Sequence, residues 1–164
     1  MRLTHARIRI VAVILAAGFS RRLGRPKQDV VFDGETLLDR ARRLASEAAD
    51  EVIAVTRENN PDAEEGMASS IRAGVSLAPA GSRILIMLCD QPLLTAEHLR
   101  ALIAVDAPIV ATGYSGIAGV PAVFAPHLAP ELLALRGDVG ARALIARHGA
   151  HIIPFENAAL DIDV

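Results

Sequence analysis

The sequence of 164 residues contains no tryptophan, one tyrosine and four phenylalanines. Sites for single-stranded nucleic acids usually stack bases on aromatic side chains, and so few aromatic residues provide no such surface. The formal net charge is only −2, so the chain as a whole does not attract polyanions. We therefore expect neither a nucleic acid nor a membrane as partner, and an anionic ligand must bind through a local group of cations.

The chain also has a single cysteine, Cys89, and so cannot form an internal disulfide. This favours a reducing compartment, and we expect a cytoplasmic protein. Residues 1–18 imitate a signal peptide, because basic residues precede a short apolar run. That run is far shorter than the ~20 residues of a membrane span, and cleavage after Ala17 would destroy the motif described below.

Aliphatic residues are abundant, with 52% of the chain hydrophobic, and the length suits one domain over residues 1–164. Continuous apolar runs, typical of strands buried on both faces, lie at 8–17, 51–56, 83–89 and 107–112. Amphipathic patterns between them predict helices at 35–49, 69–78 and 95–104, the last with Thr95 as N-cap. This alternation predicts a parallel α/β sheet.

The last third of the chain has a different pattern. Residues 119–126 alternate in polarity and predict an antiparallel strand. Helices at 129–136 and 139–149 and a closing strand at 150–155 are expected to follow it. In parallel α/β sheets, ligands bind beyond the carboxyl ends of the strands, so the residues after each strand are the candidates for a site.

The first strand runs into a loop with two glycines, Gly18 and Gly24, and four cations, Arg21, Arg22, Arg25 and Lys27. Glycine permits positive φ and close approach of a ligand. Free backbone amides in such a turn bind anions, and the cations reinforce them. The loop matches neither the P-loop nor the dinucleotide fingerprint. Two interpretations stay open, a phosphate-binding loop and a solvated basic turn.

Three aspartates are the candidate metal ligands. Asp90 ends the third strand, where a carboxylate is well placed to hold a hard cation such as Mg²⁺; the alternative is that it only begins a turn before Pro92. Asp161 and Asp163 would share one face of an extended segment, or would simply be solvated. The histidines show no zinc spacing, and Ser20 is not in a nucleophile elbow, because Arg22 replaces the second glycine.

Taken in order, these motifs resemble the nucleotidyltransferases related to the molybdenum cofactor guanylyl- and cytidylyltransferases. "LAAGFSRRLGRPK" (15–27) is similar to the family signature L-A-A-G-x-S-x-R-x-G-x-x-K at every defining position. Further segments that look like family motifs are "EGMASSIRAGV" (65–75), "LCDQPLLT" (88–95), "GVPAVF" (119–124), "LRGDVGARALI" (135–145) and "DIDV" (161–164). The resemblance therefore extends over most of the chain.

The resemblance implies a single Rossmann-like α/β/α sandwich with a mostly parallel sheet and one antiparallel strand. Its Asp-Gln-Pro and Gly-Asp-x-Gly-Ala-Arg elements are similar to the cytidylyltransferase branch, as is Ala17, where guanylyl-transferring relatives have glycine. The implied reaction transfers CMP from CTP to the phosphate of molybdopterin or its molybdenum form, with release of pyrophosphate. Mg²⁺, or alternatively Mn²⁺, is the implied cofactor, and a molybdenum hydroxylase is the candidate partner.

The resemblance also assigns the site residues. The catalytic residues would be Arg22, Lys27 and Asp90, and the metal ligands would be Asp90, Asp161 and Asp163. The nucleotide would be bound by Leu15, Ala16, Ala17, Gly18, Phe19, Ser20, Arg22, Lys27, Ser69, Ser70 and Gly74. The acceptor would be bound by Gly119, Pro121, Gly137, Asp138 and Gly140. A phosphate acceptor, with a second pKa near ~6, is mainly dianionic at neutral pH. The reaction then needs charge neutralisation and in-line positioning rather than a strong base.

Two departures from the family pattern leave alternatives open. The segment 57–66 is short, so we expect a helix and a strand of the family to be missing there. The family's closing motif continues past "DIDV", which keeps open an accessory protein that is only weakly catalytic and delivers the cofactor to a hydroxylase. A transferase acting on another acceptor, such as a sugar phosphate, is the other alternative, although a hydroxyl acceptor would need a base.

Overall fold

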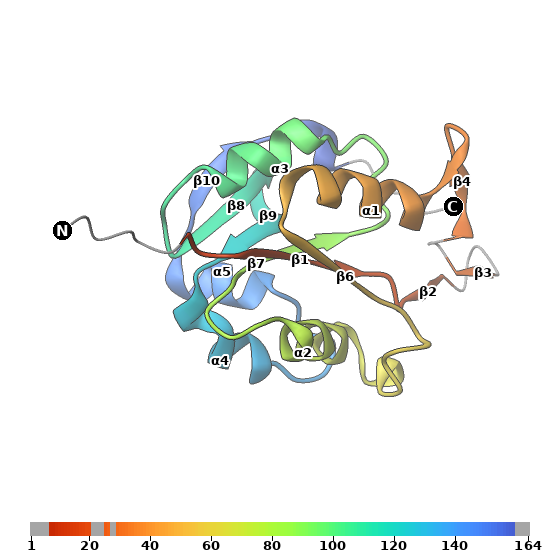
Figure 1. Cartoon of the computed structure of the whole chain (residues 1–164), viewed down its shortest axis with the longest axis horizontal. Helices are drawn as coiled ribbons and strands as arrows, with labels where there is room; N and C mark the ends of the chain where they lie inside the picture. The colour runs from red at the N-terminus through yellow and green to blue at the C-terminus, as the bar shows by residue number, and fades with distance from the viewer. Residues whose placement is uncertain (1–6, 21–24, 27–28, 160–164) are drawn as a thin grey trace.

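The computed structural model describes residues 7–20, 25–26 and 29–159, and a six-stranded sheet in the order β10-β8-β9-β7-β1-β6 forms its centre (Figure 1). The strands are β1 (Ile10–Leu15), β6 (Glu51–Val55), β7 (Arg83–Leu88), β8 (Ile109–Tyr114), β9 (Ile117–Phe124) and β10 (His151–Pro154). Only β9 is antiparallel to its neighbours within this sheet. The predicted α/β sheet with one antiparallel strand is thus confirmed.

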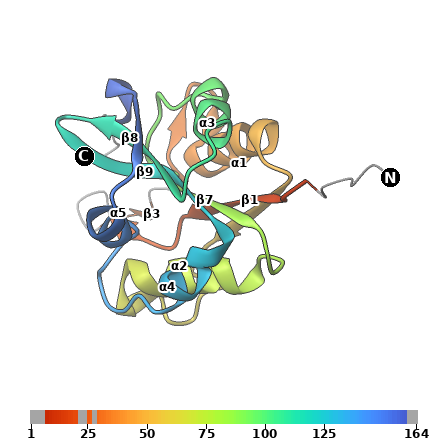
Figure 2. The ribbon, with the colours of Figure 1, turned by 90° about the vertical axis from the view of Figure 1, so that its left-hand side faces the viewer.

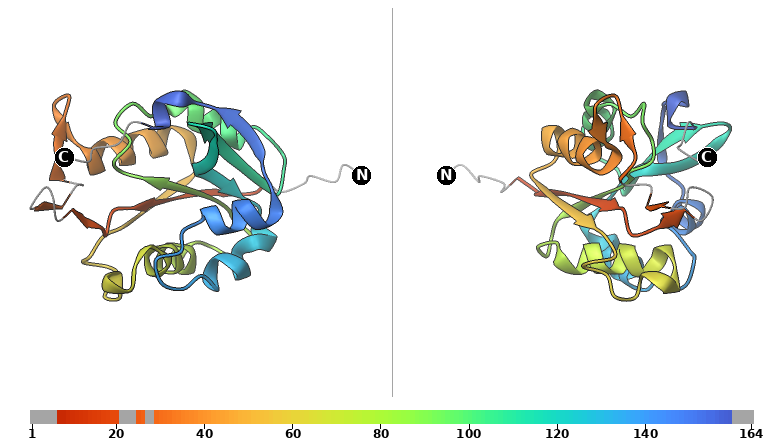
Figure 3. Two further views of the ribbon diagram at one scale, coloured as in Figure 1. Left: turned by 180° about the vertical axis from the view of Figure 1, so that it is seen from behind. Right: turned by 90° about the vertical axis from the view of Figure 1, so that its right-hand side faces the viewer.

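Helices cover both faces of the sheet, as Figure 2 shows. One face carries α1 (Leu37–Ala48) and α3 (Ala96–Ile103), and the other carries α2 (Met67–Leu77), α4 (Ala129–Leu133) and α5 (Arg142–His148). Short 3-10 helices are η2 (Ala63–Glu65), η3 (Pro126–Leu128) and η4 (Glu156–Ala159). The same three layers are visible from behind (Figure 3).

Strand β1 explains why the apolar runs in the sequence are continuous. Val11, Val13 and Leu15 belong to the core between the sheet and helices α2, α4 and α5. Ala12 and Ile14 belong to the core between the sheet and helices α1 and α3. Because both faces of the strand are buried, every position is apolar and no alternation with polar residues appears.

Two hairpins differ from the prediction. Strands β4 (Val31–Phe32) and β5 (Glu35–Thr36) pair across Asp33 and Gly34, both of which have positive φ, in a stretch where no strand was predicted. Strand β8 begins and ends two residues later than predicted, because it continues to the tight turn at Ser115 and Gly116 before β9. Both turns place residues of positive φ between the strands, as two-residue hairpin turns require.

The helix starts follow from local chemistry. The Thr95 hydroxyl accepts a hydrogen bond from the His98 amide at 3.1 Å, which confirms the predicted N-cap of α3. Thr36 caps α1 in the same way through the amide of Asp39.

Between β6 and α2 the chain contains turns and only one short helix, η2, as the brevity of this segment predicted. Within the described part of the chain, no helix is sufficiently long and apolar to cross a bilayer.

Candidate active site

Three parallel strands end at the same level of the sheet. Leu15 at the end of β1 pairs with Val55 of β6 and with Leu88 of β7. The segments that follow β1 and β7 therefore leave the sheet side by side. Strand β9 runs the other way and enters the sheet at this carboxyl edge. The order of strands thus brings the start of the predicted phosphate loop, Asp90 and the predicted acceptor strand to one edge, where ligands bind in sheets of this kind.

The loop after β1 begins with backbone packed into the protein and then becomes exposed. Ala16 and Ala17 are buried, and the Ala16 amide donates to the carbonyl of Val55 at 2.8 Å. Gly18 is exposed, its φ is not positive, and no described atom lies within 4 Å of the position that a Cβ would take. Gly18 therefore does not adopt the positive φ that glycine permits, and room for a ligand at the backbone is the remaining reason for glycine there.

Beyond Gly18 the backbone of β2 (Phe19–Ser20) pairs antiparallel with β3 (Arg25–Pro26). The predicted triphosphate ligands Arg22 and Lys27, and with them Gly24, lie outside the described residues. Their roles stay predictions from the sequence. The structure does show that the strand delivering this loop is the one that lies between β6 and β7 in the sheet.

Asp90 is half-buried directly after β7, and the next residue connects it to a distant part of the chain. The buried amide Nε2 of Gln91 donates to the carbonyl of Ala158 at 3.0 Å and to that of Val120 at 3.3 Å. Ala158 lies in η4, three positions before Asp161. Asp161 and Asp163 themselves lie outside the described residues, and within the described ones no group of three or more His, Cys, Asp or Glu residues is arranged to hold a metal ion.

Arg40 supports the loop that carries Asp90, a role that the sequence did not suggest. Its Nη2 donates to the carbonyl of Leu94 at 3.2 Å, so α1 is tied to the segment between β7 and α3. Its Nη1 lies 3.6 Å from Glu35, and the guanidinium lies over the Phe32 ring at 5.9 Å from the ring centre. The β4–β5 hairpin thus helps to orient Arg40.

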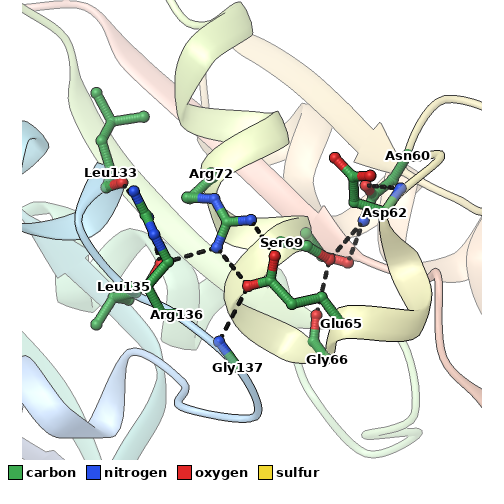
Figure 4. A network of polar contacts seen from close by, with 11 residues as sticks. Asn60, Asp62, Glu65, Gly66, Ser69, Arg72, Leu133, Leu135, Arg136 and Gly137 are labelled. Atoms are coloured by element: carbon green, nitrogen blue, oxygen red, sulfur yellow. Dashed lines mark hydrogen bonds and ion pairs between the residues drawn. The ribbon is translucent and has the colours of Figure 1, made fainter.

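Ser69 and Ser70, predicted to line the base pocket, are buried at the start of α2. Nδ2 of the buried Asn60 donates to both hydroxyl oxygens at 3.0 Å, and the Ser69 hydroxyl donates to the carbonyl of Gly66 at 2.8 Å (Figure 4). These bonds fix the first turn of α2 against the end of the loop after β6. The contact of either serine with a base stays a prediction. Asn60 was not identified from the sequence, because its partners lie nine and ten residues away.

Gly74, also predicted on the nucleotide side, lies where α2 packs on the sheet. A Cβ at this position would collide with Cγ1 of Val13 and would lie 3.2 Å from Cγ2 of Val55. Glycine therefore allows the helix to approach β1 and β6 closely. This packing accounts for the glycine whether or not the residue also contributes to nucleotide binding.

The predicted acceptor residues Gly137, Asp138 and Gly140 lie against the start of α2. The Ala68 amide donates to the carbonyl of Gly137 at 3.1 Å. Gly66 has φ +127°, and a Cβ there would collide with Asp138, while a Cβ at Gly140 would lie 2.7 Å from Sδ of Met67. The structure therefore brings together the segments 65–75 and 135–145, which the sequence had assigned to nucleotide and acceptor.

The remaining predicted acceptor residues, Gly119 and Pro121, lie in β9. A Cβ on Gly119 would lie 2.8 Å from the hydroxyl of Tyr114, and the Pro121 carbonyl accepts a hydrogen bond from the hydroxyl of Thr112 at 2.6 Å. Nε2 of His98 lies 2.8 Å from the same hydroxyl. His98 is buried and stacks on Phe155 at 4.5 Å, and this burial lowers the pKa of the imidazole. A buried polar chain from His98 through Thr112 to Pro121 thus fixes this part of β9.

A mostly parallel sheet with one reversed strand is also the fold of a nucleotidyl transferase from Methanothermobacter, which superposes with a TM-score of 0.71 at 21% identity, over 94% of this chain and 92% of that one. The chain belongs to the MobA-like NTP transferase domain family, whose model matches residues 12–152. The protein is accordingly an enzyme that transfers nucleotidyl groups.

Similar proteins carry several names. The purine catabolism protein PucB of Bacillus subtilis is 31% identical, over 83% of this chain and 80% of its own. A molybdenum cofactor guanylyltransferase of Sinorhizobium fredii is 30% identical, over 90% of this chain and 79% of its own. The crystal structure of Rv0371c from Mycobacterium tuberculosis superposes with a TM-score of 0.82 at 28% identity, over 96% of this chain and 93% of that one. Rv0371c has also been crystallised with manganese, and that structure superposes with a TM-score of 0.77 at 25% identity, over 95% and 92% of the two chains.

Proposed function

We propose that this nucleotidyltransferase transfers CMP from CTP to the phosphate of molybdopterin, or of its molybdenum form, and releases pyrophosphate. The observation that carries the proposal is the pairing of Leu15 with Leu88, because it sets the loop after β1 beside Asp90. The similarity to a molybdenum cofactor guanylyltransferase supports a molybdopterin-type acceptor. A molybdenum hydroxylase that receives the product, and a cytoplasmic location, belong to the same proposal.

In this proposal the loop after β1 binds the triphosphate of the nucleotide. Backbone amides around Ala17, Gly18 and Phe19 face the phosphates, and the side chains of Arg22 and Lys27 neutralise the β- and γ-phosphates. An oxygen of the acceptor phosphate forms a bond to the α-phosphorus while the bond to the bridging oxygen breaks, so the developing charge falls on pyrophosphate. Preorganised cations at that position stabilise the transition state directly.

Asp90 fits a Mg²⁺ or Mn²⁺ ion by its chemistry, because hard cations prefer carboxylate oxygens and Asp90 lies half-buried at the edge where the phosphates would bind. Asp163 and Asp161 are the proposed further ligands. The bond from Gln91 to Ala158 supports this assignment, since it brings the chain back to Asp90 shortly before these residues. The bound ion would supply charge neutralisation at the α-phosphate.

The acceptor is proposed to bind between the start of β9 and the turn against α2. Gly119 and Pro121 would contact it from β9, and Gly137, Asp138 and Gly140 from the turn. The contact of this turn with Met67 and Ala68 supports the assignment, because it sets residues 137–140 beside α2, the helix that carries the proposed nucleotide ligands Ser69 and Ser70. No proton needs to leave a phosphate dianion, so the reaction does not require His98, whose Nε2 is engaged with Thr112.

The choice of base rests on Ala17, which is 4% exposed at the end of the first strand. A purine differs from cytosine in size and in its pattern of donors and acceptors, so a pocket built for one leaves polar groups unpaired with the other. Guanylyl transfer from GTP is the second candidate, because two curated relatives, 30% and 29% identical, are named molybdenum cofactor guanylyltransferases.

The test combines the full chain, Mg²⁺, molybdopterin, and CTP and GTP at equal concentration. We expect pyrophosphate release and a product that carries cytidine. Equal incorporation of both bases, or a preference for guanosine, would overturn the cytidylyl assignment. Pyrophosphate release with a sugar phosphate but not with molybdopterin would identify the other acceptor class. Tight binding of molybdopterin without pyrophosphate release would identify an accessory protein instead.

A further inference from the structure

One ion pair, between Glu65 of η2 and Arg72 of α2, contacts the turn that carries the predicted acceptor residue Gly137 (Figure 4). Oε1 of Glu65 accepts a hydrogen bond from Nη2 of Arg72 at 2.6 Å, and Oε2 accepts one from Nη1 at 2.7 Å. The same Oε2 accepts the backbone amide of Gly137 at 3.0 Å, and Nη1 of Arg72 also donates to the carbonyl of Leu135 at 2.8 Å. Each member of the pair thus holds one end of the turn formed by residues 135–137.

The interaction between Glu65 and Arg72 is stronger than that of an ordinary surface ion pair. The two groups form a bidentate arrangement, which fixes the guanidinium in one plane, and the side chains of Arg72 and Glu65 are only 20% and 35% exposed. Hydrogen bonds from Arg72, and then from the Gly137 amide, lower the pKa of Glu65 to about 2. The carboxylate therefore stays ionised at every pH at which the enzyme would be assayed.

Glu65 and Arg72 are not among the residues assigned to the nucleotide or to the acceptor. Glu65 nevertheless contacts a proposed acceptor residue, because it accepts the backbone amide of Gly137. We infer that Glu65 and Arg72 are positioning residues that hold the acceptor turn against α2 and so determine the affinity for the acceptor. This inference rests on the proposed function, in which Gly137 and Asp138 contact the acceptor. A turn that is already ordered costs less free energy to fix on binding than a mobile one.

The test compares Glu65→Gln and Arg72→Lys with a matched control, Glu131→Gln. Glu131 also contacts two side chains, Arg147 at 3.0 Å and His148 at 2.8 Å, but it joins α4 to α5 without touching the turn. Lysine keeps the charge of Arg72 but cannot form the two-pronged contact. We expect the KM for molybdopterin to rise about tenfold in both test variants, as loss of hydrogen bonds to a charged group implies. The KM for CTP should stay within about twofold by the same reasoning, and the control should change neither.

A second measurement reports on the turn itself. Hydrogen exchange of the Gly137 amide should become faster in Glu65→Gln and stay unchanged in Glu131→Gln, because only the first variant weakens its acceptor. Unchanged acceptor KM in Glu65→Gln would overturn the inference, and so would parallel changes in both KM values that match those of the control. If the wild-type chain releases no pyrophosphate, the proposed function fails, and equilibrium dialysis of molybdopterin decides the inference. Equal affinity of wild type and Glu65→Gln would then refute it.

Discussion

The side-chain amide of Gln91 donates to the carbonyl of Ala158, 3.0 Å away, and so ties the residue after Asp90 to η4 near the end of the chain. The same amide donates to the carbonyl of Val120 in β9. A single buried side chain therefore holds together the loop after β7, the start of the reversed strand and the segment that leads to Asp161. Three parts of the proposed site depend on this residue for their mutual placement.

Replacement of Gln91 by methionine should separate these parts. The two carbonyls would lose their donor inside the protein, and each unmade buried hydrogen bond costs about 1–3 kcal/mol. For the two bonds together we expect the free energy of unfolding to fall by about 2–6 kcal/mol. Pyrophosphate release should fall with it, and the two quantities are measured by urea titration and by a coupled assay at a temperature where the variant is fully folded. Activity equal to that of wild type in the folded variant would show that this contact does not position the site.

Asp90→Asn should abolish activity without changing the thermal midpoint, because asparagine keeps the shape but loses the charge that a hard cation needs. Deletion of residues 161–164 should cost less activity, since water can occupy a lost ligand position. The measurement is the Mg²⁺ dependence of pyrophosphate release in both variants. A deletion variant with unchanged Mg²⁺ dependence would show that the closing aspartates do not bind the ion.

Lys27→Ala should raise the activation barrier by roughly 2–4 kcal/mol, as expected for loss of one preorganised group that stabilises developing charge. The effect should appear in kcat with CTP, while the thermal midpoint stays the same. Arg42→Ala is the matched control, because this substitution also removes one positive charge and Arg42 lies on the exposed side of α1. Wild-type turnover in Lys27→Ala would mean that Lys27 is only a surface cation.

The sheet could be predicted because its strands are buried on both faces, which gives continuous apolar runs such as residues 10–15. The β4–β5 hairpin was missed, although Asp33-Gly34 is a strong turn signal, because its strands have only two residues each and no apolar pattern. The end of β8 was placed too early, because Gly113 and Tyr114 do not extend the apolar run and only the turn at Ser115 ends the strand.

The candidate site could be predicted to the extent that its residues follow strands, because the carboxyl ends of parallel strands meet at one edge. Asp90 was identified in this way. Arg40, Asn60 and the partners of Glu65 were not identified, because their roles are set by contacts between separate elements of the structure, some of them far apart in the sequence. The Arg72–Leu135 bond, for example, spans 63 residues, and no local propensity encodes such a contact.

Two glycines that the sequence assigned to the same nucleotide site should behave in opposite ways when changed to alanine. At Gly74 the new methyl would collide with Val13, so we expect a loss of about 1–3 kcal/mol in the free energy of unfolding, typical of overpacking. At Gly18 no described atom lies within 4 Å of the new methyl, so stability should not change. Nucleotide binding by Gly18→Ala, measured by calorimetry, should weaken because the methyl would stand where the phosphates approach. Unchanged affinity would show that the glycine is not required for close approach.

His98 should make the stability of the protein depend on pH. The imidazole is 5% exposed, and burial lowers its pKa below the ordinary value of about 6.5. The unfolded chain therefore takes up a proton at a higher pH than the folded chain. The stabilisation from the neutral imidazole is fully present above about pH 6.5 and is lost as the pH falls from there towards the lower pKa of the folded state.

The test compares wild type with His98→Gln by urea unfolding between pH 7.5 and pH 5. The slope that His98 adds cannot exceed about 1.4 kcal/mol per pH unit, the value for one proton. Glutamine can still donate to the Thr112 hydroxyl but does not titrate, so the variant should lose part of the wild-type decline below pH 6.5. His151→Gln is the control, because His151 is exposed at the start of β10 and its loss leaves the buried chain from His98 to Pro121 intact. In this control the free energy of unfolding should keep the wild-type slope against pH. Parallel curves for wild type and His98→Gln would show that His98 binds its proton equally well in the folded and unfolded states.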